Sequence, residues 1–112
     1  MVERASRPYK IKVHKDVTTK DSRPFDASTR EKIKNKIREL LAVAPEQAGE
    51  PLRFELSGYR KLVVFDDYRI VYRVHRDEVI VFVLAVGIRR NSEVYRDAVK
   101  RLAALPHKGP TK

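Results

Sequence analysis

Apolar and polar residues alternate near the start of the chain, from Tyr9 to His14. A period of two is typical of a strand with one buried face, so the pattern predicts a strand there. The next segment, residues 16–23, could form a short helix, but Val17, Thr18 and Thr19 are poor helix formers. The pattern therefore leaves the conformation of that segment open.

The period changes to that of a helix after Ser28. Ser28 and Glu31 form an S-x-x-E pattern, which is typical of a helix start, and Pro45 is expected to end the helix. Its apolar stripe consists of Ile33, Ile37, Leu40, Leu41 and Ala44. Its outer face carries a basic row formed by Arg30, Lys34 and Arg38. Such a row is either a solvated helix face or a surface that follows the phosphates of a nucleic acid.

Three strands are predicted in the second half of the chain, after a loop over residues 46–51 and a short extended segment over 52–56. These strands are Tyr59–Phe65, Tyr68–His75 and Val79–Val86. The tight turns between them indicate an antiparallel meander, and the unbroken apolar run of the last is typical of a strand buried on both faces. In the middle strand the better core face is Tyr68, Ile70, Tyr72 and Val74. Arg69 and Arg73 therefore point to the other side of the sheet.

A basic turn and a helix follow the last strand. Gly87 ends the apolar run, Arg89 and Arg90 come next, and residue 91 or 92 is expected to cap a helix that carries Tyr95. Two guanidinium groups beside a helix N-terminus suit an anionic ligand. The alternative is an ordinary charged turn before a helix on which Tyr95 simply packs.

These elements predict an α+β fold. We expect a small antiparallel sheet, N-terminal helices packed on one of its faces, and a C-terminal helix. The 112 residues suit one domain, with a core over about residues 9–105 and a loose tail over 106–112.

Composition narrows the chemistry. The net charge of +10 favours polyanionic partners, namely nucleic acid, the ribosome or an acidic protein. The absence of cysteine excludes disulfides and thiolate metal sites, and no stretch has the length and apolarity of a membrane helix. The sequence has no carboxylate pair, metal-ligand cluster or phosphate-binding glycine-rich loop. We therefore expect a cytoplasmic protein without a metal or other cofactor and without membrane contact.

The cations near the sheet suggest a nucleotide site. Arg60, Arg69, Arg89 and Tyr95 are expected to converge, with guanidinium groups on a phosphate and the ring stacked on a base. If such a site cleaves RNA, the available route is attack by the neighbouring 2′-hydroxyl, with electrostatic stabilisation of the phosphorane.

Two segments carry a resemblance to a known family. GYRKLVVFDDYRIVYRV (58–74) and VFVLAVGIRRNSEVYRDAVKRL (81–102) resemble the RelE/ParE superfamily of bacterial toxins, the second segment being most similar to RelE. The resemblance covers roughly residues 9–105. It implies a toxin of a type II toxin–antitoxin pair that enters the ribosomal A site and cuts mRNA by metal-independent 2′-hydroxyl attack. It also implies an acidic antitoxin as partner, in a possible toxin–antitoxin hetero-oligomer.

The resemblance also implies roles for single residues. Arg69 matches the arginine on the scissile phosphate, Arg89 the arginine that stabilises the transition state, and Tyr95 the tyrosine that stacks on the mRNA base. Arg60 matches the first of two family lysines, and Leu62 falls where the second is expected. Arginine is a poor general base, because it stays protonated at neutral pH. The further residues expected to bind RNA are Lys61, Arg73, Arg90, Arg30, Lys34 and Arg38.

Two other functions remain open. A ParE-like toxin has the same fold and inhibits DNA gyrase through protein contacts. A non-catalytic relic would only bind antitoxin or nucleic acid, and Leu62 in place of a lysine supports it. The cations and tyrosine present at positions 69, 89 and 95 favour RNA cleavage over gyrase inhibition.

Overall fold

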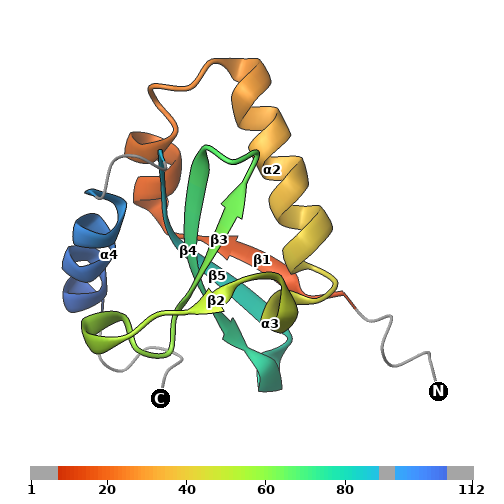
Figure 1. The fold of residues 1–112 in the computed structure, drawn as a ribbon, viewed down its shortest axis with the longest axis vertical. Helices are drawn as coiled ribbons and strands as arrows, with labels where there is room; N and C mark the ends of the chain where they lie inside the picture. The colour runs from red at the N-terminus through yellow and green to blue at the C-terminus, as the bar shows by residue number, and fades with distance from the viewer. Residues whose placement is uncertain (1–7, 89–92, 106–112) are drawn as a thin grey trace.

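A mixed five-stranded sheet forms the centre of the molecule (Figure 1). The computed structural model describes residues 8–88 and 93–105. The predicted tail at 106–112, the basic pair at 89 and 90 and the expected helix cap at 91 or 92 lie outside the described residues. The strand order is β1-β5-β4-β3-β2. The strands are β1 (Lys10–Val13), β2 (Glu50–Pro51), β3 (Arg60–Val64), β4 (Tyr68–His75) and β5 (Ile80–Ile88).

The predicted meander is confirmed, with β3, β4 and β5 paired antiparallel. The prediction of a wholly antiparallel sheet was wrong at one edge, because β1 runs parallel to β5, with Lys10 opposite Ile80 and Val13 opposite Val83. A tight hairpin forces antiparallel pairing, but β1 and β5 are joined by most of the chain and carry no such constraint. The last strand was predicted to end at Val86, before Gly87, but β5 continues through Gly87 to Ile88.

Helix α2 (Ala27–Leu41) confirms the predicted helix but not its two ends. The N-cap is Asp26, whose carboxylate accepts a hydrogen bond from the Thr29 backbone N–H at 2.8 Å, so the predicted Ser28 cap was wrong. Aspartate caps a helix as well as serine does, so residue type alone does not choose between positions 26 and 28. The helix ends at Leu41, and Pro45 instead begins a short helix, α3 (Pro45–Ala48), where its missing N–H costs nothing.

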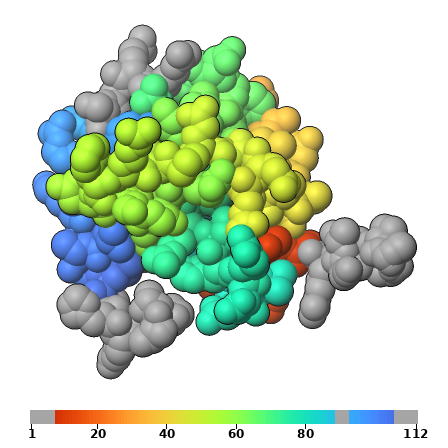
Figure 2. Space-filling model, turned by 60° about the horizontal axis from the view of Figure 1, so that its bottom comes forward, coloured from red at the N-terminus to blue at the C-terminus, as the bar shows by residue number. Residues whose placement is uncertain are grey.

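The segment between α2 and β3 differs most from prediction. The expected loop at 46–51 contains most of α3 and the edge strand β2, and the expected extended segment at 52–56 contains a 3-10 turn, η2 (Phe54–Leu56). Figure 2 shows this yellow-green segment spread across one face of the molecule, between α4 in blue and the end of α2. The open segment at 16–23 is helical, as η1 (Val17–Asp21), and a further turn, η3 (Arg76–Glu78), precedes β5.

The sheet is covered on both faces. α2 and η1 cover one face over a core that includes Leu41, Ile70 and Tyr72, which confirms the predicted core face of β4. α4 (Glu93–Ala104) and η2 cover the other, over Val71, Leu84 and Ala85. The face to which Arg69 points therefore has a core of its own. None of the helices within the described ranges is long and apolar enough to cross a membrane.

A bulge in β5 serves the second core. Val71 pairs with Ala85 and Tyr72 with Val83, so the register skips Leu84. Leu84 and Ala85 consequently both pack in the core under α4, whereas Val83 lies in the core under α2. One extra residue thus changes the phase of the strand before it reaches its end.

Candidate functional site

Arg69 and Tyr95 meet between β4 and α4. The Arg69 Nη1 donates a hydrogen bond to the Tyr95 hydroxyl at 3.0 Å, and the guanidinium carbon lies 5.6 Å from the centroid of the ring. Both residues are half-buried. Within the described part of the chain, the buried Nε of Arg69 has no hydrogen-bond partner. The structure therefore confirms that these two predicted site residues lie together.

Gly87 allows α4 to approach the sheet at this point. It lies opposite Arg69 in the β4–β5 pairing, and a Cβ added to it would lie 2.7 Å from the Cβ of Val94. Real Cβ atoms essentially never come that close. The first turn of α4 thus packs directly on the backbone of Gly87, which brings the next residue, Tyr95, to Arg69.

Lys61, and not Arg60, lies on the face of Arg69. Residues directly opposite each other in neighbouring strands share a face, and Val63 pairs with Arg69 while Lys61 pairs with Val71. Lys61 and Arg69 line one depression at the end of the sheet, together with Gly49, Glu50, Val63 and Asp66. The Lys61 ammonium lies 3.9 Å from the Glu50 carboxylate, at the surface. A lysine predicted only to bind RNA therefore occupies the place expected for Arg60.

Arg60 points to the opposite face, where it pairs with Tyr72. Its guanidinium donates hydrogen bonds to the carbonyl oxygens of Glu46 and Gly49, at 2.7 and 2.8 Å. The prediction that Arg60 converges with Arg69 and Tyr95 was wrong. The alternation of β3 is the reason, because Leu62 and Val64 fill the core and Arg60 shares their side of the strand.

The other predicted RNA-binding residues that the structure describes lie apart from this site. Arg73 is on the same face as Arg69, but its guanidinium carbon lies 5.7 Å from the centroid of the Tyr59 ring. Burial raises the pKa of Tyr59, and Arg73 opposes that rise. Arg30 donates from Nε to the carbonyl oxygens of Ser22 and Phe25 and so closes a turn before α2.

Lys34 and Arg38 are exposed on α2, beside a groove between that helix and β1. Because α2 and α4 lie on opposite faces of the sheet, the basic row of α2 does not join the Arg69–Tyr95 site. Arg89 and Arg90, both predicted near this site, lie outside the described residues.

Sequence reasoning missed Arg101. It follows Val94 and Ala98 at the spacing of one helix face, and all three are buried. An arginine at a position of the apolar stripe was the available signal, since a buried charge needs a partner. Its partner is Asp21 of η1, another residue that the sequence did not single out.

Comparison with known proteins identifies the family. A family model described as the ParE toxin of a type II toxin–antitoxin system, parDE, matches residues 11–93. The mRNA interferase toxin RelE of Escherichia coli strain K12 is 39% identical over 83 residues, which are 74% of this chain and 86% of RelE. The chain belongs to the RelE/ParE superfamily of toxins. The resemblance carried by the two sequence segments is thereby confirmed.

Solved RelE structures share the fold of this superfamily member. E. coli toxin RelE with two arginine-to-alanine substitutions, in the free state, matches with a TM-score of 0.65 and 32% identity, over 85% of this chain and 98% of RelE. The same variant in complex with a peptide of antitoxin RelB matches with a TM-score of 0.57 and 31% identity, over 83% and 96%. The predicted α+β class is confirmed, with the parallel β1–β5 pair as its one correction.

Proposed function

We propose that this chain is a RelE-type toxin that cleaves mRNA in the ribosomal A site. The observation that carries the proposal is the contact between Arg69 and Tyr95, with the cation of Lys61 on the same face. A fixed guanidinium beside an aromatic ring provides a phosphate contact and a base-stacking surface in one place. The relative that is 39% identical over most of its length is named an mRNA interferase.

The proposed reaction needs no metal. The 2′-oxygen of the nucleotide attacks the adjacent phosphorus, a new P–O bond closes a 2′,3′-cyclic phosphate, and the bond to the 5′-oxygen of the next nucleotide breaks. The 2′-hydroxyl loses its proton and the leaving 5′-oxygen gains one. Arg69 donates to the phosphoryl oxygens, whose negative charge grows in the phosphorane, while the ring of Tyr95 holds a base in line.

Lys61 changes the choice of residues that assist this step. In the sequence-based assignment an arginine stood where a general base was needed. A lysine ammonium donates to a phosphate, and lysine is also among the side chains that act as general acids and bases. On β3 the next residue on the same face is Val63, so this chain brings one lysine, not two, to the site from that strand. The ribosome is then expected to supply much of the positioning.

The proposed partners follow from charge and from the relatives. A chain with a net charge of +10 binds an RNA-rich particle readily, and an acidic antitoxin complements the same charge. A RelE relative has been solved with an antitoxin RelB peptide. We infer that this chain has an antitoxin of its own, forms a hetero-oligomer with it, and acts in the cytoplasm, where ribosomes are.

Gyrase inhibition is the second candidate, because the matching family model bears the ParE name. One experiment compares the two activities. Purified toxin is added to ribosomes programmed with a short mRNA, and in parallel to a gyrase supercoiling assay. We expect cleavage in the A site, a loss of about a hundredfold in single-turnover rate for Arg69→Ala, and undisturbed supercoiling. Supercoiling that stops, with intact mRNA, would establish the ParE-like activity. A parent chain that neither cleaves mRNA nor inhibits gyrase would establish the non-catalytic relic.

A further inference from the structure

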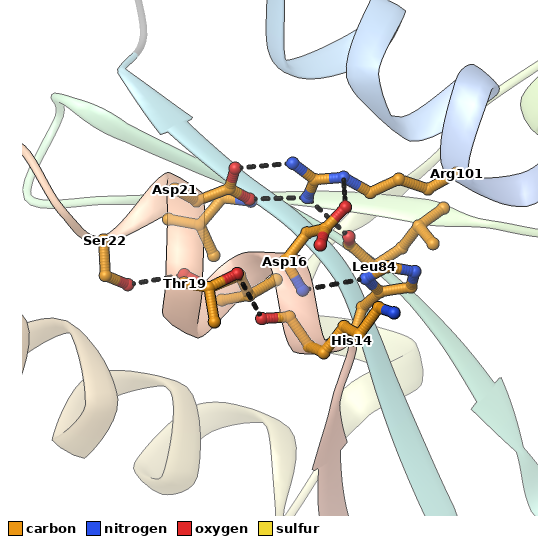
Figure 3. Close-up of polar contacts among 10 residues, drawn as sticks. His14, Asp16, Thr19, Asp21, Ser22, Leu84 and Arg101 are labelled. Atoms are coloured by element: carbon orange, nitrogen blue, oxygen red, sulfur yellow. Dashed lines mark hydrogen bonds and ion pairs between the residues drawn. The ribbon is translucent and has the colours of Figure 1, made fainter.

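A buried ion pair joins α4 to η1 at the edge of β5 (Figure 3). The side chains of Arg101 and Asp21 are only 8% and 6% exposed. They form a two-pronged contact, with 2.7 Å from Nη1 to Oδ2 and 2.8 Å from Nη2 to Oδ1. The Nε of Arg101 also lies 3.5 Å from a carboxylate oxygen of Asp16. Three charged groups from two elements are therefore held at one point under α4.

The same pair completes the edge of β5. β1 ends at Val13, and the Val83 carbonyl oxygen accepts the last bond on this side, from the N–H of His14. Beyond it the carbonyl oxygen of the bulged Leu84 accepts a hydrogen bond from Arg101 Nη1 at 3.1 Å. The N–H of Val86 donates to Asp21 Oδ2 at 2.9 Å. α4 is thus attached to a fixed point of the backbone of β5 by directional bonds, and not only by apolar packing.

These bonds bear on Tyr95, because Tyr95 is on the same helix. It precedes Arg101 by six residues, or about 9 Å along the axis. Between them Ala98 and the half-buried Val99 pack on the core under α4, and apolar contacts of this kind are not directional. A rotation of α4 by about 20° moves a group about 6 Å from its axis by about 2 Å. Such a shift breaks the 3.0 Å hydrogen bond from Arg69 to Tyr95.

We propose that Arg101 is a positioning residue for the site, whose ion pair with Asp21 at the bulge of β5 sets the rotation of α4 and thereby holds Tyr95 against Arg69. Arg101 lies on the sheet-facing side of α4 and touches no substrate. The effect on cleavage rests on the proposed function, whereas the placement of Tyr95 does not. The two are therefore measured separately.

The placement is tested in the free protein by NMR of ring-labelled tyrosines, with Tyr95 assigned from the signal lost in Tyr95→Phe. Arg101→Lys keeps the charge and loses the two-pronged geometry. Arg96→Lys makes the same change at an exposed position of α4 and is the matched control. We expect Arg101→Lys to move the Tyr95 signals and to abolish the cross-peaks between the Tyr95 ring and Arg69, while the Tyr72 signals of this variant stay as in the parent. Arg96→Lys should leave the signals of both tyrosines as in the parent. Unchanged Tyr95 signals in Arg101→Lys would overturn the proposal.

The consequence for chemistry is tested by a double-mutant cycle on programmed ribosomes at saturating concentration. We expect Arg101→Lys to slow single-turnover cleavage at least tenfold, and to slow it no further when Tyr95 is already alanine. The same loss in both backgrounds would overturn the proposal, because it would show that Arg101 acts independently of Tyr95. A parent that cuts no mRNA refutes the proposed function instead, and the NMR experiment still decides the placement.

A second variant covers the case in which Arg101→Lys does not fold. Asp21→Asn retains an oxygen that accepts from the N–H of Val86 and removes only the charged partner of Arg101. It enters both experiments with the same expected results. A folded Asp21→Asn with parental Tyr95 signals would also overturn the proposal.

Discussion

Arg60 and Lys61 are neighbours in sequence, yet their side chains lie on opposite faces of β3, and substitutions separate their roles. Arg60→Ala removes the hydrogen bonds to the carbonyl oxygens of Glu46 and Gly49. Hydrogen bonds from a charged donor contribute about 1.5–3 kcal/mol each, and two that share one group contribute less than twice that. We expect the free energy of unfolding to fall by about 2–4 kcal/mol, which lowers the melting temperature by about 8–17 °C in a domain of this size.

Lys61→Ala is expected to leave stability nearly unchanged and to slow cleavage. The Lys61 side chain is 31% exposed and its ion pair with Glu50 is long, at 3.9 Å. Exposed pairs of this kind contribute about 0–1 kcal/mol, so stability should change little. Loss of the cation on the face of Arg69 should slow cleavage by about ten- to a hundredfold, because one contact to the developing charge is missing.

The assay for this pair combines urea unfolding followed by circular dichroism with single-turnover cleavage on ribosomes. Cleavage is measured well below the melting temperature of each variant, where Arg60→Ala should cut within a few fold of the parent. Lys100→Ala, at an exposed position of α4, controls for loss of charge. A stable Arg60→Ala that cuts slowly, beside a Lys61→Ala that cuts normally, would refute the assignment of faces.

Three further predictions follow from the contacts of the site. Tyr95→Phe keeps a stacking ring and should retain most of the mRNA binding on ribosomes, whereas Tyr95→Ala should lose about 1–3 kcal/mol of it; equal binding by both would exclude stacking. Gly87→Ala should cost about 1–3 kcal/mol of stability in urea unfolding and slow cleavage, because its Cβ overlaps Val94; parental values would contradict this packing. Burial lowers the pKa of His14 below 6.5, opposed mainly by Asp16, and Nδ1 accepts the Asp16 N–H. Below pH 6.5 the unfolded chain therefore binds a proton that the folded chain does not, so the free energy of unfolding should decrease as the pH is lowered from 6.5 to the folded pKa. His14→Asn, unfolded in parallel, should lack this part of the pH dependence.

The sequence predicted the elements whose pattern is local. β4 was predicted with its observed bounds, Tyr68 and His75, because a turn on each side of the segment fixes where the strand begins and ends. The apolar stripe of α2 was predicted correctly from Ile33 to Leu41, but it was extended to Ala44, which lies beyond the helix. Its cap was not predicted, because Asp26 and Ser28 are both good caps and the backbone around them decides. The contact of Arg69 with Tyr95 was expected from the resemblance and from the faces of β4, and the structure brings the two together.

What the sequence did not predict depends on which face of a strand is buried and on distant partners. Both faces of β3 carry apolar residues, with Leu62 and Val64 on one and Val63 on the other, so alternation alone does not select the core face. Arg60 was therefore given a place that Lys61 occupies. The pairing of Arg101 with Asp21 spans 80 positions of the chain, and only the fold brings them together. The parallel pairing of β1 was hidden for the same reason.

The bulge at Leu84 is a place where this strand can lose one residue without moving the site. Upstream of Leu84 the odd-numbered residues of β5 lie toward the core under α2, and downstream they lie toward α4. A chain without Leu84 would pair regularly, with Val83 still opposite Tyr72 and Ala85 still opposite Val71. Every later residue of the strand would keep its side, and Gly87 would stay opposite Arg69. The loss would fall on the Leu84 side chain in the core under α4 and on the carbonyl oxygen that accepts from Arg101. Evolution can therefore remove the bulge and keep the faces of the site, but not the attachment of α4 to the strand.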